Sequence, residues 1–192
     1  MIFNLFRRAP READTIASLY GTIVAQGRAP DFYQNYGVPD TVNGRFEMIV
    51  LHAVLLLRRL DAGPDPSRRL GQSVFDMFCS DMDGNLRELG VGDLAVPRTM
   101  RRIGEAFYGR QQAYAAALDS ADDGLLAAAL ARNVFASPES PAGAERLAHY
   151  VRAAVRSLAD QDEAALSRGH VAFPASDSVP AAEPAAAEHI DR

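Results

Sequence analysis

The sequence predicts an all-helical protein: a single compact bundle of about six helices followed by a disordered, acidic, Ala/Pro-rich C-terminal tail. A chain of 192 residues with 48% hydrophobic residues has the length of one domain and enough apolar side chains for one core. Apolar residues recur at helical spacing, and strand-like alternation is nearly absent. We expect a flexible N-terminus over 1–12, a helical domain over 13–168 and a tail over 169–192.

The first half of the domain contains two predicted helices joined by a connector. The first helix spans about 13–27 and carries an apolar stripe made of Ile16, Leu19, Tyr20, Ile23 and Val24. Residues 29–41 connect it to the next helix, with a short helical turn around Asp31–Tyr36. The second helix, about 42–61, is apolar around most of its circumference, so we expect it to be the central and most buried element.

Glycine and proline residues separate the remaining helices, which we place at about 67–89, 96–118, 122–135 and 142–167. Residues 169–192 are rich in Ala, Pro, Glu and Ser and have almost no periodic apolar content. A segment of this composition buries too little apolar surface to fold, which predicts disorder.

Composition excludes several classes of function. A net charge of -5 argues against general nucleic-acid binding. Cys79 is the only cysteine, so no intrachain disulfide and no cysteine cluster can form, and the four histidines share no metal-ligand spacing. Met1–Phe6 is too short for a signal peptide, and the longest apolar run, Phe46–Leu57, is too short to span a bilayer. We expect a cytoplasmic protein without cofactor or metal.

An enzyme is one alternative, and it would use the carboxylates Asp81, Asp83 and Glu88. On a helix Asp81 and Asp83 would point about 200° apart, which makes joint action on one substrate difficult. The same stretch begins like a calcium loop, but Leu86 and Gly92 occupy the positions that need Gly and Glu. We therefore predict no catalytic residue.

A membrane-surface adaptor is a second alternative. The apolar start Met1–Phe6 is followed by Arg7, Arg8 and Arg11, a pattern that can contact an anionic leaflet. A frayed terminus explains the same residues without a function. If the contact exists, residues 1–11 would hold the protein peripherally at the inner face of the cytoplasmic membrane.

Aromatic residues also stand out in two segments, the connector and the predicted helix over 96–118. Phe32, Tyr33 and Tyr36 lie within five residues of the connector, where aromatics either close a core edge or present an adhesive surface. Tyr108 and Gly109 lie inside a predicted helix, where glycine is unfavourable by about 1 kcal/mol relative to alanine. Such a glycine indicates close approach of another backbone, from this chain or from a partner.

Several stretches together resemble one family, the ubiquinol–cytochrome c chaperones. The matching segments run in order over about 15–120: Leu19-Tyr20, Ile23-Val24-Ala25-Gln26, Phe32-Tyr33, Gly37-Val38-Pro39-Asp40-Thr41, Gly44-Arg45-Phe46-Glu47-Met48, Asp81-Met82-Asp83, Leu86-Arg87-Glu88, Gly90-Val91-Gly92-Asp93, Ala106-Phe107-Tyr108-Gly109-Arg110 and Ala113-Tyr114. The resemblance implies an all-helical chaperone without turnover that binds newly synthesised cytochrome b and assists its incorporation into the cytochrome bc complex of the respiratory chain (complex III). It also implies a second assembly factor and the ribosome as partners.

These observations predict an aromatic groove with a polar border that covers an apolar client segment. The expected client-binding residues are Phe32, Tyr33, Tyr36, Val38, Arg45, Asp83, Arg87, Tyr108, Arg110 and Tyr114.

Overall fold

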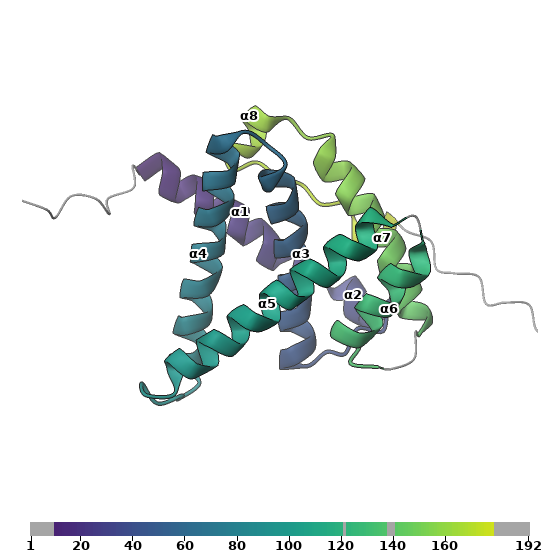
Figure 1. Cartoon of the computed structure of the whole chain (residues 1–192), viewed down its shortest axis with the longest axis horizontal. Coiled ribbons are helices and arrows are strands. Elements are labelled where there is room, and N and C mark those ends of the chain that lie inside the picture. Colours follow the sequence, from purple (N-terminus) through teal and green to yellow (C-terminus); the bar gives the residue numbers. More distant parts are fainter. Residues whose placement is uncertain (1–9, 121, 138–140, 179–192) are drawn as a thin grey trace, which may run out of the picture.

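The computed structural model describes residues 10–120, 122–137 and 141–178, and all regular structure in these ranges is helical. The elements are α1 (Pro10–Gly27), α2 (Pro30–Gln34), α3 (Val42–Asp61), α4 (Asp65–Glu88), α5 (Val96–Asp119), α6 (Asp123–Asn133), α7 (Ala142–Ala159), α8 (Glu163–Leu166) and the 3-10 helix η1 (Ser176–Ser178) (Figure 1). The all-helical prediction is confirmed. None of the helices within the described ranges is both long and apolar enough to cross a bilayer.

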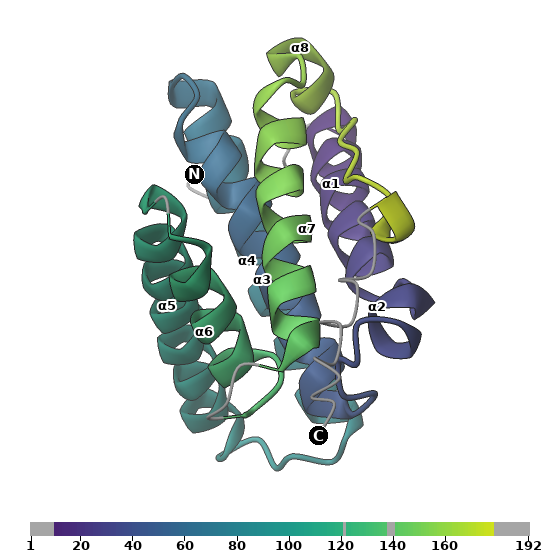
Figure 2. The same ribbon diagram turned by 90° about the vertical axis from the view of Figure 1, so that its right-hand side faces the viewer.

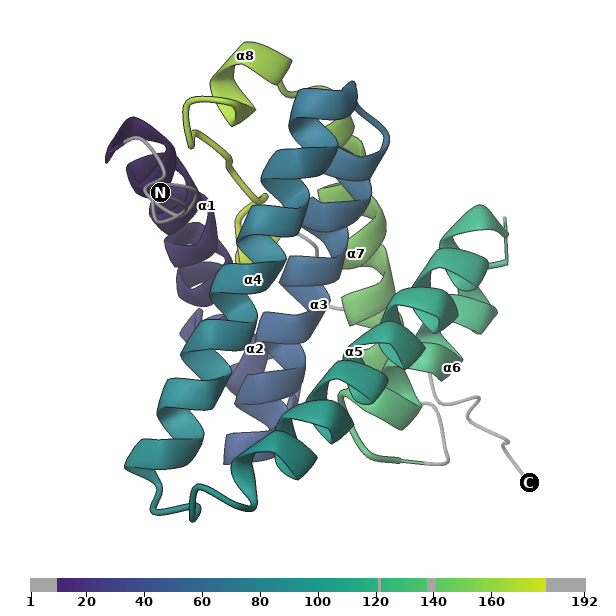
Figure 3. The same ribbon diagram turned by 60° about the vertical axis from the view of Figure 1, so that its left-hand side comes forward.

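Helix α3 is the centre of the bundle, as its sequence predicts. It contacts α1, α4, α5 and α7, and twelve of its 20 residues are buried. Thr41 caps its start, because the Thr41 hydroxyl accepts a 3.0 Å hydrogen bond from the amide of Gly44. Figure 3 shows α1 and α4 on one side of α3 and α5, α6 and α7 on the other, and Figure 2 shows α7 between α1 and the α5–α6 pair.

The helix predicted over 142–167 is interrupted. Helix α7 ends at Ala159, and the side chain of Asp162 then caps the separate short helix α8 by accepting from the amide of Ala164 at 3.2 Å. Arg59 of α3 holds this corner, since its guanidinium donates to the Leu158 carbonyl at 2.9 Å and to Glu163 at 3.0 Å. A long-range contact of this kind leaves no periodic signal in the sequence.

Residues 169–178 differ from the prediction, which places them in the tail. The Ser18 hydroxyl donates to the Gly169 carbonyl at 2.8 Å, and Gln26 donates to the Pro174 carbonyl at 3.1 Å. The Phe173 ring lies 5.0 Å from the imidazole of His52, with the two planes nearly perpendicular. The packed domain therefore extends at least to Ser178, while 179–192, which carry the rest of the predicted tail, lie outside the described residues.

His52 is a hydrogen-bonded histidine of the core. It is fully buried; Nδ1 lies 2.8 Å from the Met48 carbonyl and Nε2 lies 2.9 Å from the Tyr150 hydroxyl. A carbonyl only accepts, so Nδ1 carries the proton and Nε2 accepts from the tyrosine. Desolvation lowers the pKa of His52 to about 4.

Acidification should destabilise the protein through this histidine. The unfolded chain binds a proton at His52 near pH 6.5 and the folded chain only near pH 4, so the free energy of unfolding falls as the pH falls between these values. Between pH 7 and pH 5 we expect a loss of roughly 2 kcal/mol that His52→Gln removes. Urea unfolding at both pH values measures it. The exposed His149 supplies the control, because His149→Gln should keep the full pH dependence; an unchanged dependence in His52→Gln would contradict the assignment.

Candidate functional site

Four of the residues predicted to line an exposed groove lie inside the core. Phe32 and Tyr114 are 0% exposed, and Tyr36 and Val38 are 1% and 2% exposed. The connector is not a loose loop, because α2 turns the Phe32 ring inward until it meets the Tyr150 ring edge-on at 4.9 Å between centroids. The prediction that these four residues face water is therefore wrong; they close the edge of the core.

Tyr33, the remaining aromatic residue of the connector, is half-buried. Its hydroxyl donates to the Gly27 carbonyl at 2.6 Å, and burial raises the pKa of this phenol. Arg45 and Asp40 lie beside it as an exposed ion pair with 2.6 Å between Nε and Oδ1. These side chains share a recess of about 190 Å³, here called the connector recess, which is lined by Arg28, Pro30, Tyr33, Gln34, Asp40 and Arg45.

Arg110 has a structural contact rather than a place on a polar border. Its guanidinium binds both carboxylate oxygens of Glu47, at 2.8 and 2.6 Å, and so joins α5 to the central helix. The Glu47 side chain is 2% exposed, whereas that of Arg110 is 23% exposed. A buried carboxylate needs such a partner, because desolvation strongly disfavours an unpaired charge.

Arg87 and Asp83 brace the turn between α4 and α5. The Arg87 guanidinium contacts Asp83 at 2.7 Å and Asp93 at 2.6 Å, so one side chain connects the end of α4 with the loop that follows it. Both residues are accessible, but neither lines the connector recess.

An open recess lies between α4 and α5. The two helices diverge from their common turn (Figures 1 and 3). Helix α3 forms the floor of the recess, whose volume is about 170 Å³. The lining residues are Leu57, Asp61, Arg68, Gly71, Gln72, Phe75, Phe107, Tyr108 and Gln111. We call this space the α4–α5 recess.

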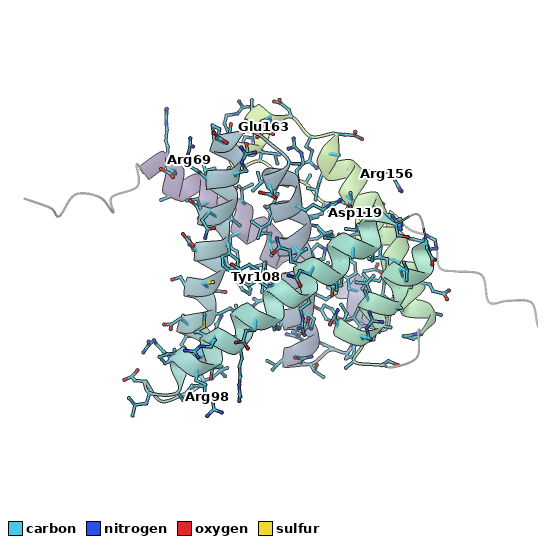
Figure 4. All side chains as sticks on the ribbon, in the orientation of Figure 1. Arg69, Arg98, Tyr108, Asp119, Arg156 and Glu163 are labelled. Atoms are coloured by element: carbon cyan, nitrogen blue, oxygen red, sulfur yellow. The ribbon has the colours of Figure 1, made fainter. Side chains whose placement is uncertain are left out.

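Tyr108 is the aromatic residue that this recess presents to water. It is 55% exposed and points into the space between the two helices (Figure 4). Its ring lies 5.8 Å from that of Phe75, which in turn lies 4.9 Å from that of Phe107. Of the predicted aromatics, Tyr108 and Tyr33 are the two that remain accessible, and they occupy recesses that share no lining residue.

A further recess borders the α4–α5 recess along the C-terminal half of α3. It has a volume of about 320 Å³ and is lined by Leu55, Arg58, Arg59, Asp61, Ala62, Val155, Leu158 and Ala159. Asp61 lines both recesses. Arg58 and Asp119 form an exposed ion pair at 2.7 Å that ties the end of α5 to α3 beside this space.

The sequence pattern did not indicate a role for Phe75, although Gly71, Phe75 and Phe78 share one face by their spacing. At Gly71 helix α4 lies close to Leu60 and Leu57, and an added Cβ would be at an ordinary contact distance, 3.4 Å, from the Leu60 Cβ. At Gly109, in contrast, an added Cβ would meet nothing within 4 Å among the described residues, so the close approach predicted there does not occur within the described chain.

Two of the three carboxylates of the enzyme alternative, Asp81 and Asp83, are engaged in other contacts. Asp81 accepts a 2.7 Å hydrogen bond from the Tyr20 hydroxyl, and Asp83 binds Arg87. Burial, followed by the bond to Asp81, raises the pKa of Tyr20. No group of three or more His, Cys, Asp or Glu side chains in the described ranges is arranged to hold a metal ion.

The described residues form a helical bundle with open recesses on its surface. The sequence model of the Ubiquinol-cytochrome C chaperone family matches residues 34–173, which is most of the chain. The chain belongs to the ubiquinol–cytochrome c chaperone family.

Its relatives include one solved structure and two curated proteins. The crystal structure of the Cbp3 homolog from Brucella abortus is 39% identical, covers 94% of this chain and 100% of its own, and has a TM-score of 0.82. Ubiquinol-cytochrome-c reductase complex assembly factor 1 of Xenopus laevis is 28% identical over 129 residues, 67% of this chain and 64% of that protein. The mouse protein of the same name is 27% identical over 141 residues, 73% of this chain and 48% of its own length. The match thus spans about half to two thirds of these curated relatives.

Proposed function

We propose that this protein is an assembly chaperone that binds newly synthesised cytochrome b and assists its incorporation into the cytochrome bc complex, without catalysing a reaction. Membership of the chaperone family supports the role, and the α4–α5 recess with the exposed Tyr108 is the observation that supports the mode of binding. The names of the amphibian and mouse relatives, assembly factors of ubiquinol–cytochrome c reductase, point in the same direction.

The recess can hold an apolar side chain of a bound helical segment. Phe75, Phe107 and Leu57 supply an apolar base, and Tyr108 adds a ring with a polar tip. Arg68, Gln72, Gln111 and Asp61 surround this base with groups that can fix the orientation of a bound segment. Segments of a membrane protein outside the bilayer aggregate in water, so a groove that covers their apolar face keeps them competent for assembly.

Because four of the predicted client-binding residues are buried, the roles proposed for the others change. Tyr108 becomes the central contact, Tyr33 and Arg45 form a second accessible patch, and Asp83 and Arg87 shape the α4–α5 turn. The proposal keeps the protein cytoplasmic, at the inner face of the membrane where its client is inserted. A second assembly factor and the ribosome remain proposed partners.

Site-specific photo-crosslinking tests the proposal. A photoreactive phenylalanine analogue at Tyr108 should crosslink apocytochrome b in cells that synthesise it, and mass spectrometry of the purified adduct identifies the client. Leu125 on α6, which is 51% exposed, gives a matched position outside both α3 recesses and should yield little adduct. Absence of apocytochrome b from the adducts of Tyr108 and of Tyr33 alike would reject the proposed client.

A further inference from the structure

The turn between α4 and α5 exposes two leucines. Leu89 is 75% exposed and Leu94 is 98% exposed, although both are large apolar side chains. Both lie in the turn that joins α4 to α5, and neither lines the α4–α5 recess. Val42, 82% exposed, begins α3 at the same end of the molecule (Figures 1 and 3).

The backbone of the turn is well defined. Gly90, with φ +80°, ends α4 in a left-handed conformation, and the Val91 amide donates back to the Leu86 carbonyl at 3.0 Å. The amide of Ala95 then donates to the Gly92 carbonyl at 2.8 Å. Arg87 also forms an ion pair with Asp93, which adds a side-chain contact to these backbone bonds. With this geometry the turn holds both leucines facing outward.

Three exposed arginines follow these leucines along the chain. Arg98, Arg101 and Arg102 are exposed on the first turns of α5, and no ion pair engages them within the described residues. Figure 4 places Arg98 beside the end of the hairpin. From Arg87 to Arg102 four arginines stand against two acidic residues, a local balance of +2 in a chain of net charge -5.

We propose that this end of the α4–α5 hairpin is a docking site for an anionic membrane surface. Leu89 and Leu94 enter the headgroup region, and Arg98, Arg101 and Arg102 pair with lipid phosphates. Apolar side chains that lead a group of arginines match an anionic lipid interface, which offers a hydrocarbon boundary and negative charge together. A nucleic acid would satisfy the arginines but would leave two aliphatic side chains in water, and the turn lacks the aromatic rings on which bases stack. The site shares no residue with the 1–11 segment or with the lining of the proposed client recess.

Flotation of the full chain with vesicles tests the proposal. We expect binding to vesicles of phosphatidylglycerol and phosphatidylcholine and little binding to pure phosphatidylcholine. Leu89→Ser with Leu94→Ser, and separately Arg98→Gln with Arg101→Gln and Arg102→Gln, should each reduce binding more than tenfold. Leu125→Ser and Arg69→Gln, the latter at the opposite end of α4, should leave binding unchanged (Figure 4).

A fluorescent reporter adds a direct readout of insertion. The chain has no tryptophan, so Leu94→Trp creates a single indole whose emission should shift to shorter wavelength with anionic vesicles. Equal binding of the wild type and both turn variants would overturn the proposal and assign membrane contact elsewhere, as would no binding by the wild type. Binding of an RNA oligonucleotide that depends on the arginines but not on the leucines, with no indole shift on vesicles, would overturn it in favour of a nucleic acid.

Discussion

Arg110→Met is expected to lower the free energy of unfolding by about 3 kcal/mol or more, because it leaves the buried Glu47 carboxylate without its bidentate partner. Glu47→Gln should be less harmful, since the Arg110 side chain is 23% exposed and can turn its charge toward water. Urea unfolding at pH 7 of both variants measures this asymmetry.

Two further variants control this prediction. Glu47→Leu combined with Arg110→Met should recover most of the loss, because replacing both members of a buried pair removes the uncompensated charge. Arg58→Met breaks the exposed pair with Asp119 and should change the free energy of unfolding by less than about 1 kcal/mol. Equal losses in Arg110→Met and Arg58→Met would show that burial of Glu47 has no energetic consequence.

Tyr108→Asp is expected to weaken client binding about thirtyfold, since loss of a central interface aromatic typically removes about 2 kcal/mol of binding free energy. Stability should change by no more than about 1 kcal/mol, because Tyr108 is 55% exposed. Recovery of newly synthesised cytochrome b with the tagged protein measures the first effect, and thermal unfolding measures the second.

Tyr33→Asp shows whether the client binds in the α4–α5 recess or in the connector recess. If the client occupies the α4–α5 recess, this variant should retain binding even though it loses the bond to the Gly27 carbonyl. The reverse result, with Tyr108→Asp fully active and Tyr33→Asp inactive, would move the client to the connector recess beside Arg45.

Most of the fold could be predicted because helical periodicity and glycine or proline breaks are local signals. The central position of 42–61 followed from a circumference that is apolar over most of its extent, and α3 is indeed buried along most of its length. The break near Asp160 and the packing of 169–178 could not be predicted in this way. They depend on Arg59 reaching Leu158 and on Phe173 reaching His52, contacts between residues far apart in the sequence.

The site was harder to predict because exposure is a tertiary property. Three aromatics within five residues indicate a special segment, but whether Phe32 and Tyr36 face water depends on whether α7 covers them with Tyr150. Tyr108 stays accessible because α4 and α5 diverge. Arg110 resembles a border residue in the sequence, yet it neutralises a buried carboxylate on another helix.

The position of Tyr108 along α5 sets the distance between the proposed client recess and the proposed membrane contact. Tyr108 follows Val96, the first residue of α5, by twelve positions, so the helix separates them by about 18 Å. Leu94 lies two residues before Val96, so a polypeptide held at Tyr108 would be on the order of 20 Å from the hairpin end. That distance is shorter than one membrane-spanning helix of about 30 Å. A captured segment could thus pass from protein to lipid without ever travelling its own length through water.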